Sequence, residues 1–380
     1  MASSPVAAGL PGPKSAGLAL ARVSLEPGGV ALVPHRPRAP RPEEVELKVT
    51  LCGLSGADVV VYHADPAFDW VRSGTVLGHE AVGVVSAVGL LVPEWPAPGT
   101  RVVPVSMLSC GDCEECMADR PQQCARPSTL GLNRDGTAAR TALVPWQNLL
   151  AVPEGLPDTT AVLAEPTSVA WRAAATVGQI RPGDRVAVST TRAVGLLAAL
   201  IARSLGADVV MVGRSGPHHQ QRQELAASLG LRSTTDPGPE SVDVWIEASG
   251  SGKQLASAVE VLRPGGKLVL VAMYATGARQ TVNTLVGKEL AVVTSYASTR
   301  PDFDDALAFL TTMPDLGERL ITVYPIGQAV EALRLTAEGA ITIGGTAATL
   351  ADLGFTAGTT APTATVNTAS DDRTTLQTQF

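Results

Sequence analysis

Residues 110–124 read CGDCEECMADRPQQC and place four cysteines at the spacing C-x2-C-x2-C-x7-C. Four thiolates in one short segment match the closed tetrahedral sulfur set of a structural zinc ion, which has no open position for chemistry. The residues between them show no apolar period, so metal binding has to fold this lobe. Disulfides or free thiols that meet by chance are the alternative. The spacing, without a secretion signal, favours zinc on Cys110, Cys113, Cys116 and Cys124.

Composition limits the remaining possibilities. The chain has 380 residues, 45% of them hydrophobic, which predicts two domains with buried sheets. No apolar run approaches the ~20 residues of a membrane span. A net charge of −7 without a basic stripe argues against nucleic acid as a partner. The first residues, MASSP, do not resemble a signal peptide, and five cysteines suit a reducing cytoplasm.

The N-terminal part has a β pattern. Apolar and polar residues alternate over residues 44–51, as in a half-buried strand, and residues 78–89 read as a strand interrupted by glycines. Residues 1–16 are expected to be a flexible leader. The composition of residues 353–380, rich in Thr, Ala and Ser without a period, predicts a disordered tail.

Residues 185–271 alternate between two kinds of pattern. The sequence predicts strands at 185–189, 209–212, 242–247 and 267–271, helices at 194–206, 220–229 and 255–262, and a turn at 263–266. Strands that alternate with helices at this spacing predict an α/β fold with a doubly wound parallel sheet.

Several of these features together resemble one family. Gly78-His79-Glu80, the cysteine lobe, Glu165-Pro166 and the strand–helix alternation are similar to zinc-containing medium-chain dehydrogenases/reductases, in particular to the polyol, threonine and glucose dehydrogenase branches. The resemblance covers roughly residues 17–350. It implies a GroES-like catalytic domain at 17–156, with the zinc lobe at 107–127 and a completing segment at 296–352. It also implies a Rossmann domain at 157–295, a substrate cleft between the two domains, and a homodimer or homotetramer.

The resemblance also implies a catalytic zinc site in the cleft. His79 and Glu165 would hold the metal, Glu80 would assist, and Asp58 would orient His79. From the residues alone, a satisfied core histidine is the alternative for His79, but its Gly and Glu neighbours favour a ligand.

The turn before Asp58 departs from the family pattern. Where the family has a ligand cysteine this chain has Ser55, and where it has a proton-relaying hydroxyl this chain has Ala57. A neutral hydroxyl is a poorer zinc ligand than a thiolate. Cys52 offers a substitute ligand, or it is a small buried residue of a strand, which we favour. Ser55 or a water molecule would then have to carry the substrate proton.

The phosphate-binding loop is a second departure. The family's G-x-G-x-x-G becomes Thr190-Thr-Arg192-Ala-Val194-Gly195, which keeps only the glycine that lets the helix pack on the strand. Thr190 and Arg192 can bind a phosphate, and the helix N-terminus offers free N–H groups. Alternatively, the Arg192 side chain fills the space of the pyrophosphate.

The end of the second strand of the nucleotide domain, Gly213-Arg214-Ser215, has no acidic residue to accept the ribose hydroxyls of NAD. Arg214 can pair with a 2′-phosphate, so we predict NADP; a solvated arginine in a turn is the alternative.

The sequence therefore predicts a zinc-dependent, NADP-preferring oxidoreductase that transfers hydride between the nicotinamide and a small alcohol, polyol or ketone. The alternative is a redox-inactive descendant, either a lyase or cyclase or a binding protein. It would keep the fold and the structural zinc, because Ser55, Ala57, Thr190 and Arg192 replace functional residues of the family.

Overall fold

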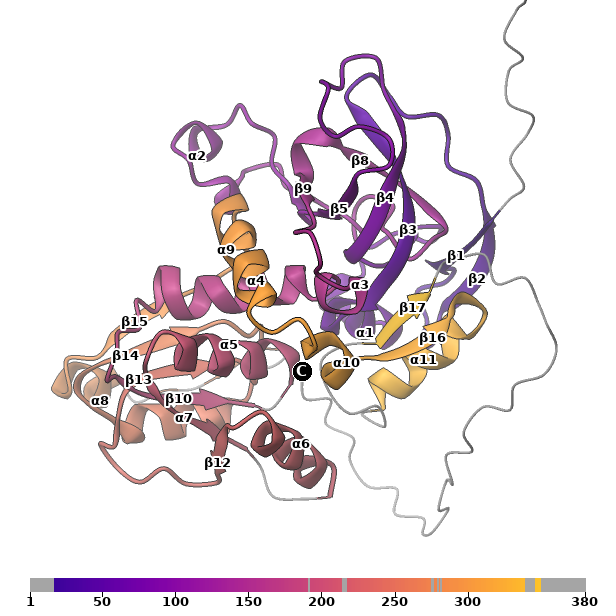
Figure 1. Cartoon of the computed structure of the whole chain (residues 1–380). Coiled ribbons are helices and arrows are strands. Elements are labelled where there is room, and N and C mark those ends of the chain that lie inside the picture. The colour runs from indigo at the N-terminus through magenta and orange to yellow at the C-terminus, as the bar shows by residue number, and fades with distance from the viewer. Residues whose placement is uncertain are drawn as a thin grey trace, which may run out of the picture.

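The computed structural model describes residues 17–338 and 346–349, apart from residues 191, 214–216, 275, 276, 279 and 281. It contains two sheet-based units joined by helices α4 and α9 and their neighbours (Figure 1). The predicted leader and tail lie outside the described residues, as do Thr191, Arg214 and Ser215.

The first unit is built on a seven-stranded sheet in the order β16-β17-β3-β4-β5-β9, with β8 pairing β3 as well. Two hairpin-like pairs, β1-β2 and β6-β7, lie beside it. The strands are β1 Gly17–Arg22, β2 Val30–His35, β3 Glu44–Leu54, β4 Glu80–Val88, β5 Arg101–Pro104, β6 Met107–Leu108, β7 Ser128–Thr129, β8 Thr141–Pro145, β9 Leu149–Ala151, β16 Thr322–Pro325 and β17 Thr346–Thr349. The last two strands come from the far end of the chain, and β17 pairs antiparallel with β3.

The second unit is a six-stranded parallel sheet in the order β12-β11-β10-β13-β14-β15. Its strands are β10 Arg185–Ser189, β11 Asp208–Val212, β12 Arg232–Thr234, β13 Val242–Glu247, β14 Leu262–Leu270 and β15 Ala291–Thr294. Consecutive strands run outward in both directions from β10 and β13, so the strand order reverses between these two. The predicted doubly wound sheet is confirmed.

Short helices cover both units. The α-helices are α1 Gly56–Tyr62, α2 Glu114–Met117, α3 Asp158–Ala161, α4 Ala164–Trp171, α5 Ala193–Ser204, α6 Pro217–Ser228, α7 Gly252–Val261, α8 Val282–Gly287, α9 Arg300–Thr311, α10 Leu316–Leu320 and α11 Ala329–Ala337. A π-helical segment, η4 Arg172–Val177, continues α4, and 3-10 turns η1 Pro66–Phe68, η2 Pro121–Gln123, η3 Trp146–Asn148 and η5 Ile326–Gln328 lie in loops.

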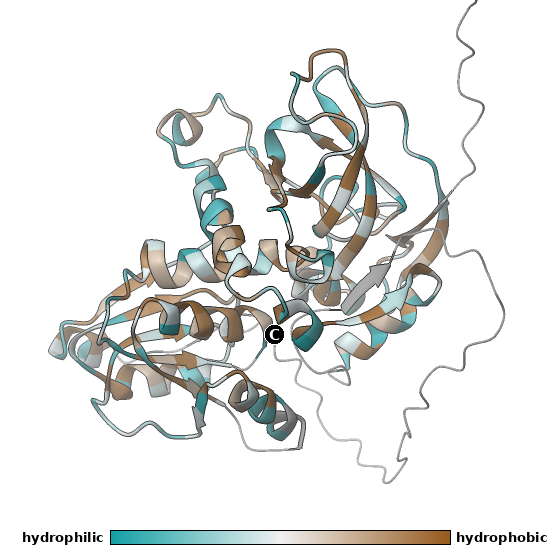
Figure 2. Ribbon diagram, in the orientation of Figure 1, coloured by the Kyte–Doolittle hydropathy of each residue, from teal (hydrophilic) through white to brown (hydrophobic). Residues whose placement is uncertain are grey.

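Alternating side chains of β10 point to opposite faces of the parallel sheet, as pleating requires. Val186 and Val188 pack in the cluster that contains α5, whereas Ala187 packs with α7 on the other face. Such double burial explains why these strands are almost continuously apolar in sequence. Figure 2 shows the strands of this sheet as predominantly hydrophobic.

The turn predicted at 263–266 is a bulge inside β14. Leu262 pairs with Val242, but the next pair joins Lys267 to Val244, so the intervening residues project from the ladder. Gly265 has φ +72°, a conformation that glycine adopts without a steric penalty.

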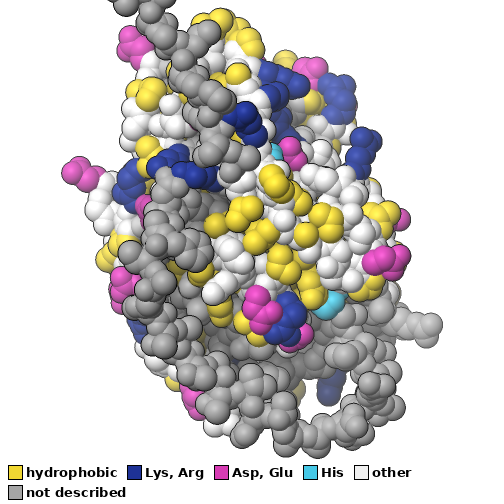
Figure 3. Space-filling model, turned by 90° about the vertical axis from the view of Figure 1, so that its right-hand side faces the viewer, with side chains coloured by type: hydrophobic (Ala, Val, Ile, Leu, Met, Phe, Trp, Pro, Cys, Tyr) yellow, Lys and Arg dark blue, Asp and Glu magenta, His cyan; other side chains and the backbone are white. Residues whose placement is uncertain are grey.

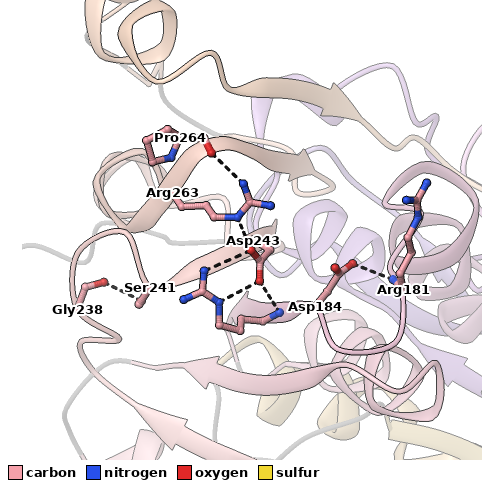
Figure 4. A network of polar contacts seen from close by, with 8 residues as sticks. Arg181, Asp184, Gly238, Ser241, Asp243, Arg263 and Pro264 are labelled. Atoms are coloured by element: carbon pink, nitrogen blue, oxygen red, sulfur yellow. Dashed lines mark hydrogen bonds and ion pairs between the residues drawn. The ribbon is translucent and has the colours of Figure 1, made fainter.

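Asp243 holds the amino edge of the parallel sheet together (Figure 4). Its carboxylate accepts hydrogen bonds from Arg185 on β10 (3.0 Å) and from Arg263 in the β14 bulge. The hydrogen bond from Arg185, reinforced by Arg263, holds the pKa of Asp243 well below its usual range. This carboxylate at the start of β13 is therefore neutralised by two arginines.

The surface is mixed in character. On the face seen in Figure 3, acidic and basic side chains are interspersed around a central group of hydrophobic side chains. Within the part of the chain that the structure describes, no helix is both long and apolar enough to cross a bilayer.

Candidate functional site

The four lobe cysteines converge on one point. The Sγ–Sγ distances are 3.4 Å for Cys113–Cys116, 3.5 Å for Cys124–Cys110, 3.9 Å for Cys110–Cys116 and 4.0 Å for Cys113–Cys124, and none is in a disulfide. Four ligands at ~2.3 Å from a tetrahedral zinc ion lie about 3.8 Å apart, so the sulfur geometry fits that ion. Hydrogen bonds from the backbone, chiefly at Ala125, lower the pKa of Cys113 to about 6, which favours the thiolate.

A second cluster joins the two units. Ligand atoms of His79, Glu80 and Glu165 all lie within 4.8 Å of one another. His79 immediately precedes β4, Glu80 is the first residue of β4, and Glu165 lies in the first turn of α4, where Ser106 donates a hydrogen bond of 3.0 Å to it. The predicted metal residues are thus brought together from positions 85 residues apart.

Gly53 makes room for this cluster. It pairs with Glu80 across β3 and β4, and a Cβ atom at position 53 would lie 2.2 Å from Glu80 Oε2. Burial, together with the carboxylates of Glu165 and Asp58, raises the pKa of Glu80 well above its usual range.

The cluster fits a divalent cation. His79 is only 8% exposed, and its Nδ1 atom has no hydrogen-bond partner among the described residues. A buried polar atom without a partner costs free energy, as do two carboxylates that face each other. A cation bound by one imidazole and two carboxylates would offset both costs.

Ser55 and Asp58 form a capping box at the start of α1. The Ser55 hydroxyl accepts from the backbone N–H groups of Ala57 (3.1 Å) and Asp58 (3.3 Å) and donates to Asp58 Oδ2 (2.8 Å). Asp58 Oδ1 accepts from the backbone N–H of Gly78 at 3.0 Å. Among the described residues, Asp58 thus binds the backbone of the residue before His79 and makes no hydrogen bond to the imidazole, so the orientation of His79 by Asp58 stays a prediction.

Cys52 is not part of either metal cluster within the described residues. It is fully buried in β3, its Sγ lies 3.4 Å from Thr137 Oγ1, and burial raises the pKa of its thiol. A Cβ atom on Gly78 would lie 2.6 Å from this sulfur. The interpretation of Cys52 as a small packed residue is confirmed, and its use as a substitute ligand is not supported.

The loop after β10 contains a residue in a backbone conformation that favours glycine. Thr190 has φ +81°, which is strained for a β-branched residue and costs about 1–3 kcal/mol. Its Oγ1 accepts from the N–H of Arg192 (3.3 Å), the N-cap of α5. A Cβ atom on Gly195 would lie 2.7 Å from the Thr190 methyl group, so Gly195 permits close packing of α5, while Val194 is half-buried in its first turn.

Two arginines lie near the loop. Arg192 is exposed, yet the surrounding protein desolvates its guanidinium and lowers its pKa. Desolvation and then repulsion by Arg192 lower the pKa of Arg222, which lies on α6. Sequence reasoning missed Arg222 because only the fold brings α6 to this loop.

Gly213, another predicted cofactor residue, directly follows β11. Its backbone N–H donates a hydrogen bond to the carbonyl oxygen of Thr234 (2.9 Å), and a Cβ atom at this position would lie 3.3 Å from Gln223.

Comparison with known proteins agrees with this geometry. The family model for the alcohol dehydrogenase GroES-like domain matches residues 41–154, and that for zinc-binding dehydrogenases matches residues 193–312. An L-threonine 3-dehydrogenase of Anaeromyxobacter sp. (strain K) is 31% identical over 253 residues, 61% of this chain and 70% of that protein. The starvation-sensing protein RspB of Escherichia coli (strain K12) is 28% identical over 279 residues, 71% of this chain and 81% of that protein.

Among solved structures, the alcohol dehydrogenase TADH of Thermus sp. ATN1 aligns with a TM-score of 0.77 at 29% identity, covering 87% of this chain and 99% of that chain. Fold, metal clusters and sequence similarity together define an oxidoreductase of the zinc-binding dehydrogenase class. The chain belongs to the zinc-containing medium-chain dehydrogenase/reductase family, as an alcohol dehydrogenase-like enzyme.

Proposed function

We propose that the chain transfers hydride between NADP(H) and a small secondary alcohol, polyol or ketone. The observation that carries the proposal is the cluster of His79, Glu80 and Glu165, the first two buried and the third partly buried, which joins the first unit to α4, a helix that packs with α5 in one core. A zinc ion held by these three residues would supply Lewis-acid polarisation of the substrate oxygen.

The chain's own residues orient that site. Ser106 fixes Glu165, and Asp58 fixes the backbone before His79. The Ser55 hydroxyl donates one hydrogen bond and accepts two, so its capacity is used by the cap. We therefore propose Ser55 and Asp58 as positioning residues, and the substrate proton leaves through water rather than through residue 57, an alanine.

The preference for NADP rests on positive charge at the end of the β10–β11 half of the sheet. The partial desolvation of Arg192 and Arg222, together with their mutual repulsion, makes a bound dianion favourable there. Among the described residues, neither guanidinium has a carboxylate partner. Arg214, the residue that led to the NADP prediction, lies outside the described residues.

One titration tests both the activity class and the cofactor. We expect two zinc ions per chain by elemental analysis and saturable binding of NADPH by nucleotide fluorescence. Arg222→Ala should weaken NADPH binding about 10- to 100-fold, the effect of one lost charged hydrogen bond, and leave NADH binding unchanged. Gln220→Ala on the same helix is the control, because Gln220 pairs with Glu224.

Two other results of this titration would contradict these proposals. Equal losses for NADPH and NADH in Arg222→Ala would refute the 2′-phosphate assignment. One zinc ion per chain and no binding of either nucleotide would instead support the redox-inactive descendant.

We also propose that the enzyme is a homodimer or homotetramer. Strand β15 is an edge of the parallel sheet, and Val292 in this strand is 44% exposed. Val286 on α8 and Tyr296 after β15 are 69% and 61% exposed. Exposed apolar edges of this kind favour pairing with a second copy.

Light scattering should show an oligomer for the wild-type chain, and Val292→Glu should dissociate it. Leu90→Glu is the control, because Leu90 is exposed in a turn outside this edge, and it should leave the oligomer intact. A monomeric wild-type chain would refute the proposal.

The cytoplasm is the compartment we propose. A zinc-binding set of four cysteines without disulfides is stable where thiols stay reduced. An oxidising compartment would couple these sulfurs in pairs.

A further inference from the structure

A buried carboxylate lies at the opposite end of β13 from Asp243. Glu247 is fully buried and accepts hydrogen bonds from Ser189 Oγ (3.0 Å), from the backbone N–H of Ser249 (2.9 Å), from the Ser249 hydroxyl and from Tyr274 Oη (2.5 Å). The N–H of Gly250 adds a fifth donor at 3.3 Å. All these donors are neutral.

The two ends of β13 therefore differ in kind. Asp243 is held by two arginines, whereas no lysine or arginine among the described residues donates to Glu247. An ion pair that only holds strands together suffices at the amino edge. At the carboxyl edge a buried carboxyl group is instead held by neutral donors from three separate segments, an arrangement that an ion pair between strands does not explain.

The position of Glu247 is the place where a doubly wound sheet binds its ligand. Ser189 and Glu247 are the last residues of β10 and β13 and pair in register. The strand order reverses between these strands, and ligands of such sheets bind in the crevice at that reversal, beyond the carboxyl ends. The hydrogen bond from Ser189 to Glu247 thus crosses the floor of the crevice.

Tyr274 reaches this floor from the segment after β14. The backbone carbonyl of Glu247 also accepts from the N–H groups of Val271 (3.0 Å) and Ala272 (3.3 Å). Residues 271–274 are therefore tied to Glu247 at both ends of the segment. Burial and the carboxylate raise the pKa of the Tyr274 phenol, so it remains a hydrogen-bond donor at neutral pH.

We propose that Glu247 and Tyr274 act as a positioning pair that holds residues 271–274 in place to receive the nicotinamide half of the cofactor. This inference rests on the proposed function. A dinucleotide that crosses the reversal places one mononucleotide over β10–β11 and the other over β13–β14. The basic residues Arg192 and Arg222 lie on the β10–β11 side, which leaves the β13–β14 side, with Tyr274, to the nicotinamide.

The test is Tyr274→Phe, which removes one oxygen from a half-buried ring. Two titrations are compared: NADPH, and adenosine 2′,5′-bisphosphate, which lacks the nicotinamide half. We expect NADPH binding to weaken about 5- to 30-fold, as for the loss of one hydrogen bond that leaves a buried acceptor without a donor, with fragment binding unchanged. In steady state, KM for NADPH should rise more than kcat falls.

Ser249→Ala is the matched control. It also removes a hydroxyl donor to Glu247, but the Ser249 N–H still donates and residues 271–274 keep their tie to the carboxylate. It should leave both affinities within about twofold, because that backbone bond remains. If Tyr274→Phe does not fold, as judged by thermal unfolding, Glu247→Gln replaces it with the same expectation.

The possible outcomes separate the two claims. Unchanged NADPH binding in Tyr274→Phe, or equal losses for NADPH and the fragment, would overturn the positioning role. A wild-type enzyme that binds neither NADPH nor the fragment would instead overturn the proposed function, whatever the variant does.

Discussion

His79→Ala is expected to lower kcat/KM for the alcohol or ketone by at least about a thousandfold, because Lewis-acid stabilisation contributes several kcal/mol to the transition state. Loss of the imidazole leaves only Glu80 and Glu165 to hold a cation, both of them carboxylates that repel each other when it is absent. Zinc should fall from two ions per chain to one, while NADPH binding persists. Steady-state kinetics, elemental analysis and nucleotide fluorescence measure the three quantities.

The control is His35→Ala at the last residue of β2. It removes an imidazole that belongs to neither metal cluster of the described residues. It should keep two zinc ions and full activity. Two zinc ions in His79→Ala with activity near wild type would mean that the cluster of His79, Glu80 and Glu165 is not the catalytic metal site. Loss of both zinc ions would instead point to global unfolding, which a thermal melt detects.

The local sequence pattern was enough to predict the strands and helices of the parallel-sheet unit. Strands β10 and β13 match the predicted 185–189 and 242–247, because double burial makes both strands apolar and short loops limit them. Helix α5 begins and ends within two residues of its prediction, since its residues are nearly all small and apolar and a glycine follows its end. The sequence predicts a turn where β14 has a bulge, because a bulge shows only in the pairing with β13, which local sequence does not contain.

The candidate metal residues were predictable for a different reason. His79 and Glu80 are adjacent, and the four cysteines lie within 15 residues, so their spacing carries the signal. Only part of the role of Asp58 could be predicted from the sequence. Ser55-Gly-Ala-Asp58 has the spacing of a capping box, which accounts for two of its bonds, but its bond to Gly78 depends on the pairing of distant segments.

The positioning network around Glu247 was not predictable from sequence. It joins Ser189, Glu247 and Tyr274, which are separated by 58 and 27 residues and meet only because their strands are neighbours in a parallel sheet. The same holds for Arg192 and Arg222. A single acidic residue at the end of an apolar strand carries no signal about what donates to it.

Ser55 shows how the fold survives a change of site chemistry. At the position where the resemblance implies a ligand thiolate, the Ser55 hydroxyl caps α1 and binds Asp58. Such a cap contributes about 1 kcal/mol to stability. A metal ion at the cluster of His79, Glu80 and Glu165 would have one nitrogen and two oxygen ligands, a harder set than one that includes sulfur. We therefore expect such an ion to exchange more readily than the lobe ion.

Cys116→Ser is expected to remove one zinc ion per chain and to unfold the lobe between residues 109 and 127. The lobe has almost no apolar contacts of its own: helix α2 has four residues and none of them is buried. Binding of a structural zinc ion contributes about 10–16 kcal/mol, far more than any packing available here, so folding of the lobe depends on the ion. Limited proteolysis should cleave the variant within the lobe, whereas the wild-type chain resists.

Met117→Ala is the matched control for the lobe, because Met117 is 77% exposed, follows Cys116 directly and offers no strong ligand. It should keep both zinc ions and resist cleavage. A chelator that removes the lobe ion from the wild-type chain should reproduce the cleavage pattern of Cys116→Ser, and zinc should restore resistance. Since the lobe packs few side chains on the rest of the chain, the main thermal transition should stay nearly unchanged. A Cys116→Ser chain that retains two zinc ions and its resistance would show that the four sulfurs do not hold a structural metal.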